Sequence, residues 1–154
     1  MSEILFLNIS GPDHPGITAS FTQALARHSV NILDIDQAVT HDFLSLGMSL
    51  EIPEGESASP ILEELEALAR EQGVRIWSTP IRLDDYEHWV AQQGQPRYIV
   101  TLLGRKLSAA NIAHVAEVAA RYGVNIDMLR RLSGRFPLVH RGAGEDSLRA
   151  CVAF

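Results

Sequence analysis

The chain has 154 residues, 46% of them hydrophobic and 21% charged, a composition typical of soluble globular proteins. The net charge of −6 argues against a phosphate-backbone partner, and no apolar run approaches the roughly 18 residues that a membrane span needs. A single cysteine, Cys151, cannot form an internal disulfide, and the start MSEILFLNIS does not resemble a signal peptide. We therefore expect a cytoplasmic protein that binds neither nucleic acid nor membrane.

The first half of the chain alternates between strand and helix patterns. Period-two alternation predicts a strand over residues 5–9, which ends at the turn-forming loop GPDHPG. A helical spacing follows over 17–28, and two further strands over 30–39 and 43–52 flank a hairpin turn at His41 and Asp42. An amphipathic helix over 61–69, which Gly73 can end, precedes a fourth strand over 74–83.

This βαββαβ order predicts an α+β fold, the ferredoxin-like sandwich, for residues 1–83. Residues 84–96 are predicted to be a linker with one helical turn at Tyr86 and Trp89. The plan then restarts in 97–154, with a strand over 98–103, a helix over 109–122, a strand over 124–132 and a third strand within SLRACVAF. The similarity of SVNILDID to GVNIDMLR supports an internal repeat.

The second copy lacks residues for a second helix and a fourth strand. In the usual ferredoxin-like order the fourth strand pairs with the first, so the strand over 98–103 would keep an open edge. We expect this strand to pair with another chain, and we expect a homodimer.

The loop GPDHPG, followed by a helix and then VNILDI, resembles an ACT domain. The tandem order of YEHWV, RYIVTLLGRK, GVNID and RRLSGR resembles the N-terminal regulatory region of bacterial phosphoserine phosphatases. The resemblance runs over the whole chain. It implies a parent enzyme that hydrolyses O-phospho-L-serine to L-serine and phosphate, in serine biosynthesis, through a Mg-dependent haloacid-dehalogenase domain that follows the ACT pair.

That catalytic domain is absent from this sequence, so the chain by itself is expected to be a regulatory module without enzyme activity and without a cofactor. The pair Asp34 and Asp36 resembles the nucleophile strand of haloacid-dehalogenase phosphatases. It lies in an amphipathic strand, however, without the distal acidic pair that would hold Mg²⁺. We interpret the match as accidental and expect both aspartates on one exposed strand face. The resemblance to the ACT fold implies that Asp34 lies next to the effector loop, which makes it a candidate contact.

The strongest candidate for a binding site is the loop GPDHPG. A loop that leads into a helix offers backbone N–H groups and the positive end of the helix dipole to a carboxylate. Asp13 can accept hydrogen bonds from an ammonium group and Gly16 allows close approach, with Asn31 as a second polar contact; alternatively, Asp13 and Asn31 cap the helix ends. The predicted ligand-binding residues of the first copy are Asp13, His14, Pro15, Gly16, Ile17, Asn31 and Asp34.

The second copy contributes Gly104, Arg105 and Asn125 as less secure candidates, because its loop lacks the Asp-x-Pro-Gly pattern. No metal site is expected, since the six histidines have no metal-ligand spacing.

The leading hypothesis is an amino-acid-sensing, dimer-forming regulatory module with L-serine as its ligand. One alternative is a free-standing tandem-ACT regulator that acts through protein interaction. A second alternative, an acylphosphatase-like enzyme, is opposed by an aspartate in the loop where phosphate would have to bind.

Overall fold

The computed structural model describes residues 3–94, 97–104, 108–132 and 150–153. The chain divides into two compact units, Met1–Gly94 (unit 1) and Gln95–Phe154 (unit 2). Each is described by itself. No helix in the described ranges is long and apolar enough to cross a membrane.

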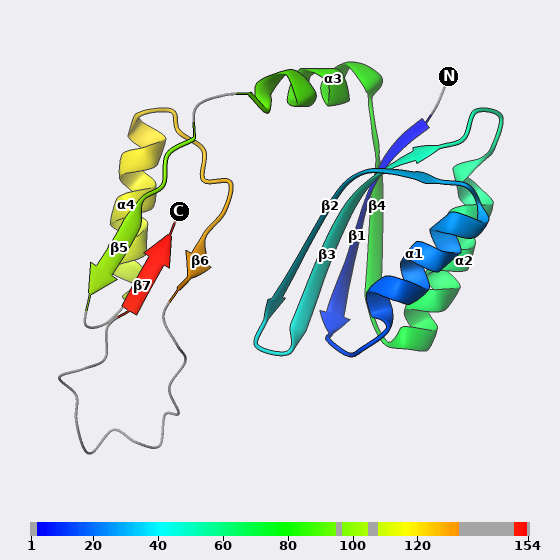
Figure 1. Ribbon diagram of the computed structural model, residues 1–154, viewed down its shortest axis with the longest axis horizontal. Coiled ribbons are helices and arrows are strands. Elements are labelled where there is room, and N and C mark those ends of the chain that lie inside the picture. Colours follow the sequence, from blue (N-terminus) through cyan, green and yellow to red (C-terminus); the bar gives the residue numbers. More distant parts are fainter. Residues whose placement is uncertain (1–2, 95–96, 105–107, 133–149, 154) are drawn as a thin grey trace. The chain divides into compact units, whose positions relative to one another are not determined.

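Unit 1 is a four-stranded antiparallel sheet with two helices on one face (Figure 1). Its elements are β1 (Glu3–Pro12), α1 (Ile17–Arg27), β2 (Asn31–Thr40), β3 (Phe43–Ile52), α2 (Ala58–Gln72) and β4 (Arg75–Ile81). The strand order β2-β3-β1-β4 is that of a ferredoxin-like sandwich, which confirms the predicted fold class.

The core of unit 1 lies between the sheet and its helices. Every second side chain of β1 and of β3 points into this core, where it packs against the apolar side of the two helices. The side chains that are at most 1% exposed include Leu7, Ile9, Phe21, Leu25, Leu44, Leu46, Leu50, Ile52 and Leu65. Glu64, in the middle of α2, forms hydrogen bonds with Arg27 and His28 at the C-terminal end of α1. These hydrogen bonds, that of Arg27 first, hold the pKa of Glu64 below its usual range.

Gly73 ends α2 with φ 70°, a left-handed conformation that glycine adopts without strain, as its position in the sequence predicted. The segment 84–96, predicted to be a linker, differs from that prediction. A ten-residue helix, α3 (Leu83–Gln92), replaces its single helical turn, with Asp84 and Asp85 placed at the end of the helix dipole that favours acidic residues.

Unit 2 contains β5 (Thr101–Gly104), α4 (Ala109–Arg121), β6 (Arg130–Arg131) and β7 (Ala150–Ala153), with sheet order β5-β7-β6. A capping box between Ser108 and Asn111 starts α4. The predicted strand over 124–132 is wrong for residues 124–129, because within this segment only Arg130 and Arg131 pair with β7. The predicted strand over 98–103 begins three residues late, at Thr101, where pairing with β7 begins.

Candidate functional site

The loop between β1 and α1 is held by neighbours on both sides. Gly11, at the end of β1, packs so closely on Val74 that a Cβ at this position would lie 3.0 Å from the Val74 Cα. Two residues later the backbone N–H of Asp13 donates to the carbonyl of Asp42 at 2.7 Å, which ties the loop to the β2–β3 hairpin. The chain therefore reaches α1 along a fixed path.

The N-terminus of α1 has no side-chain cap. Its N-cap residue is Gly16, at φ 101° and thus in the left-handed region that glycine favours. Since no side-chain oxygen accepts from the first helical turn, its backbone N–H groups remain available to a ligand. This arrangement corrects one interpretation of the sequence: Asp13 does not cap the helix.

A hollow of about 420 Å³ opens at this point, with lining residues Asp13, His14, Pro15, Gly16, Ile17, Thr18, Ala19 and Gln37. The structure thus brings together five of the residues singled out from the sequence. Thr18 and Ala19 extend the same helical turn, and they could have been added by following the helix start forward. Gln37 comes from β2 and has no signal in the local sequence.

Gln37 is fixed by a hydrogen bond from the first turn of α1. The Thr18 hydroxyl donates to the Gln37 Oε1 at 2.7 Å. Because the amide oxygen is engaged, the amide nitrogen is the group of Gln37 that is left to donate. The hollow therefore combines backbone donors from α1, an amide donor from β2 and the carboxylate of Asp13.

His14 anchors the loop to the end of α2. Its Nε2 lies 3.1 Å from the carbonyl oxygen of Gln72, and its Nδ1 lies 3.3 Å from that of Pro15. A neutral imidazole has a single N–H and can donate to one of these oxygens, whereas the protonated ring donates to both. These bonds raise the pKa of His14, the Gln72 carbonyl most, then the Pro15 carbonyl, with a smaller contribution from the charge of Asp13.

A pH dependence follows from this raised pKa. A group whose folded pKa exceeds its unfolded one stabilises the fold fully below the unfolded pKa, and this contribution is lost as pH rises through the folded pKa. We expect NMR titration of the His14 ring to give a midpoint above the ordinary histidine value. In His14→Gln, which keeps a donor but cannot titrate, this part of the pH dependence of thermal unfolding should disappear. An unshifted midpoint would contradict the anchoring role.

Asn31 does not join this hollow. In a βαβ unit the second strand starts at the end where the first began, so Asn31 lies in the row of Ile4 and Glu51, about 26 Å along the sheet from Pro12. Its amide donates to the Glu51 carboxylate at 3.2 Å. It does not cap α1 either: the left-handed residue after that helix is Ser29, at φ 53°.

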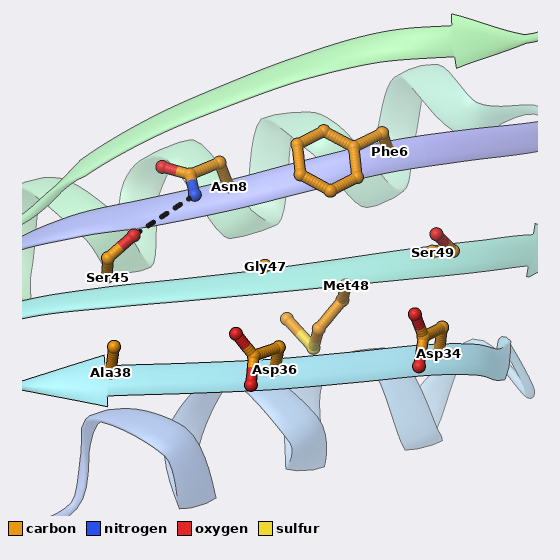
Figure 2. Close-up of a pocket in the computed structure, with 9 residues that line it drawn as sticks. All are labelled: Phe6, Asn8, Asp34, Asp36, Ala38, Ser45, Gly47, Met48 and Ser49. Carbon is orange, nitrogen blue, oxygen red and sulfur yellow. Dashed lines mark hydrogen bonds between the residues drawn. The ribbon is translucent and has the colours of Figure 1, made fainter. Parts of the chain in front are cut away.

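Asp34 lines a different hollow, of about 290 Å³, on the sheet face that the helices leave open (Figure 2). Asp36 lies beside it, and both aspartates are exposed, as expected from the alternation of β2. Since β2 is an edge strand of an antiparallel sheet, it does not provide the buried parallel strand that a haloacid-dehalogenase nucleophile occupies. The resemblance of this pair to a phosphatase motif is therefore not supported by its position.

Unit 2 contains the three other candidate residues, and the two that are described do not line a common hollow. Gly104 ends β5, Arg105 lies outside the described residues, and Asn125 lines a hollow of about 510 Å³. Asn125 donates to the Asp127 carboxylate at 3.2 Å. Among the described residues no group of three or more His, Cys, Asp or Glu side chains could hold a metal ion.

Comparisons with known proteins agree with this architecture. Residues 3–78 and residues 97–140 each match an ACT domain family. The chain belongs to the ACT domain family, with one domain in each unit.

Two curated relatives indicate which kind of ACT protein this chain resembles. The chain is 30% identical over 129 residues to a phosphoserine phosphatase of Mycobacterium tuberculosis, covering 84% of this chain and 31% of the relative. It is 32% identical over 159 residues to a phosphoserine phosphatase of Streptomyces coelicolor, covering 97% of this chain and 36% of the relative. The chain thus resembles an ACT regulatory region of a phosphoserine phosphatase, and it spans about a third of the length of these relatives.

A second group of relatives is shorter. A UPF0237 protein of Methanococcus maripaludis is 37% identical over 75 residues, which cover 48% of this chain and 83% of that protein. Among solved structures, an unknown protein from Galdieria sulphuraria superposes with a TM-score of 0.69 at 20% identity, covering all of this chain and 83% of its own. This last likeness supports the fold alone.

Proposed function

We propose that the chain is the amino-acid-sensing regulatory region of a phosphoserine phosphatase and that its ligand is L-serine. The observation that carries the proposal is the hollow at the start of α1, where uncapped backbone N–H groups lie beside the carboxylate of Asp13. An α-amino acid offers a carboxylate to the first and an ammonium to the second. Serine is favoured as the product of the reaction for which the two long relatives are named.

Titration calorimetry of the purified chain with L-serine tests this proposal. Glycine, L-alanine and O-phospho-L-serine are the matched controls, since they vary the side chain while keeping the zwitterion. Saturable heat with serine and little or none with the controls is expected. The absence of binding heat with every compound of the panel at millimolar concentration would refute sensing by this chain.

The chain is also proposed to form a homodimer. In the described part of unit 2, β5 has a strand on one side alone, and the residues before it expose large apolar side chains, Tyr98 at 72% and Ile99 at 84%. An open strand edge beside exposed apolar surface favours association. Light scattering should give twice the chain mass, and a monomer at every concentration would contradict this.

A second candidate is a free-standing ACT protein that acts by protein interaction. It is favoured by the UPF0237 relatives, because their match to about half of this chain covers most of their own length. A gene whose reading frame continues from this chain into a phosphatase domain would exclude it.

A further inference from the structure

Among the described residues of unit 1, no helix covers one of the two faces of the sheet. α1 and α2 cover the opposite face, and α3 continues from the end of β4 without lying across the sheet (Figure 1). The open face is called the outer face here, and its central residues are Phe6, Asn8, Asp34, Asp36, Ser45, Gly47, Ser49 and Trp77. Figure 2 shows most of these side chains on the side of the strands away from the helices.

The strand register divides the outer face into an acidic side and an aromatic side. Asp36 of β2 lies opposite Gly47, which lies opposite Asn8, which in turn lies opposite Trp77 of β4. Three strand spacings, about 14 Å, therefore separate the carboxylates from the indole. Serines and Gly47 lie between them and leave a shallow hollow of about 290 Å³.

Both sides of the outer face suit a cationic partner. Trp77 is 59% exposed, and Phe6 meets it edge to face with ring centroids 5.9 Å apart. Guanidinium groups stack on aromatic rings and pair with carboxylates, and exposed aromatic residues are frequent anchors of protein interfaces. The chemistry of this surface therefore fits arginine side chains on another protein surface.

The charge of the chain identifies a source of such side chains. Unit 1 has 4 Lys and Arg against 15 Asp and Glu, a net charge of −11, whereas unit 2 has 9 against 4, a net charge of +5; together they give the −6 of the chain. Arg130 and Arg131 of β6 are exposed members of this basic set.

We propose that the outer face of unit 1 binds the basic unit 2 of a second copy of the chain. A two-fold dimer built in this way makes the same contact twice. The alternative, unit 1 against unit 1, would bring −11 against −11, and like charges across an interface are strongly disfavoured. The inference rests on the homodimer proposed above, but not on the identity of the ligand.

Sedimentation equilibrium of four versions of the chain tests this surface. Asp34→Lys with Asp36→Lys reverses the acidic side of the outer face, and Arg130→Glu with Arg131→Glu reverses charges on unit 2. Glu63→Lys with Glu66→Lys is the matched control, because it makes the same charge change on exposed positions of α2, behind the sheet. Circular dichroism verifies that each version is folded.

We expect each of the first two variants to weaken the dimer at least tenfold at low salt, and the α2 control to leave it within about threefold. Mixing the two weakened variants should restore a heterodimer, since lysines then face glutamates. If the wild type dimerises while both variants behave like the control, or if the mixture gives no heterodimer, the outer face is not the contact. A monomeric wild type would overturn the homodimer as well.

Discussion

Replacing Phe21 by alanine should destabilise unit 1 by about 3 to 5 kcal/mol, the usual cost of deleting a buried phenyl ring. Phe21 is fully buried on α1, between that helix and the sheet. Because domains of this size are stable by about 5 to 15 kcal/mol, the loss takes a large fraction of the total. Chemical denaturation followed by the tryptophan fluorescence of unit 1, from Trp77 on β4 and Trp89 on α3, measures it.

Phe43→Ala is the matched control for this prediction. It makes the same chemical change at a side chain that is 54% exposed, at the start of β3. We expect a cost below about 1 kcal/mol there, as is typical of surface positions. Equal losses in the two variants would mean that the phenyl ring of Phe21 does not pack as described.

Displacing α1 should also affect the candidate site, since this helix supplies its N–H groups. We expect Phe21→Ala to weaken serine binding even under conditions where unit 1 is still folded.

The architecture of unit 1 was predictable because each element carries a clear period. Every second residue of β3 from Leu44 to Ile52 is buried, as alternation requires. In β2 a register shift between Ile32 and Asp34 inserts Leu33 as an extra residue. Ile32 packs against the core, whereas Ile35, which pairs with the buried Met48, is 47% exposed. Such a bulge has no mark in the sequence, although the prediction for Asp34 and Asp36 survives it.

Unit 2 was predicted less well, since strands depend on partners as well as on pattern. Residues 124–129 have the apolar content of a strand, yet within the segment 124–132 only Arg130 and Arg131 have partners on β7. Periodicity describes which face of a strand is apolar. It does not supply the neighbouring strand that would satisfy the backbone.

In the candidate site, the residues that are contiguous in the sequence were predictable, and the residue that comes from another strand was not. Its contiguous part, Asp13 to Ile17, followed from the chemistry of a loop that enters a helix. Asn31, which the sequence offered as a polar contact at the start of the second strand, begins β2 at the other end of the sheet and does not line the hollow. Gln37 was missed because it reaches the hollow from another strand, through tertiary structure alone.

Removing the amide of Gln37 should weaken serine binding by about 10- to 100-fold. The hydrogen bond from Thr18 leaves the Gln37 amide nitrogen as a donor toward the hollow. Hydrogen bonds to charged groups are worth about 1.5 to 3 kcal/mol, and about 1.4 kcal/mol corresponds to a tenfold change in affinity. Gln37→Leu deletes the donor, and Gln37→Glu should be worse still, because it places a second carboxylate beside that of the ligand.

Gln23→Glu provides the control, since it makes the same change on an exposed position of α1 outside the hollow. Thr18→Val separates two roles of the amide. It keeps Gln37 but removes the hydroxyl that fixes its orientation, so an intermediate loss of affinity is expected. If calorimetry found serine affinity unchanged in Gln37→Leu while Asp13→Ala abolished it, the ligand would be held by the loop and helix alone, and the carboxylate would be bound entirely by the N–H groups of α1.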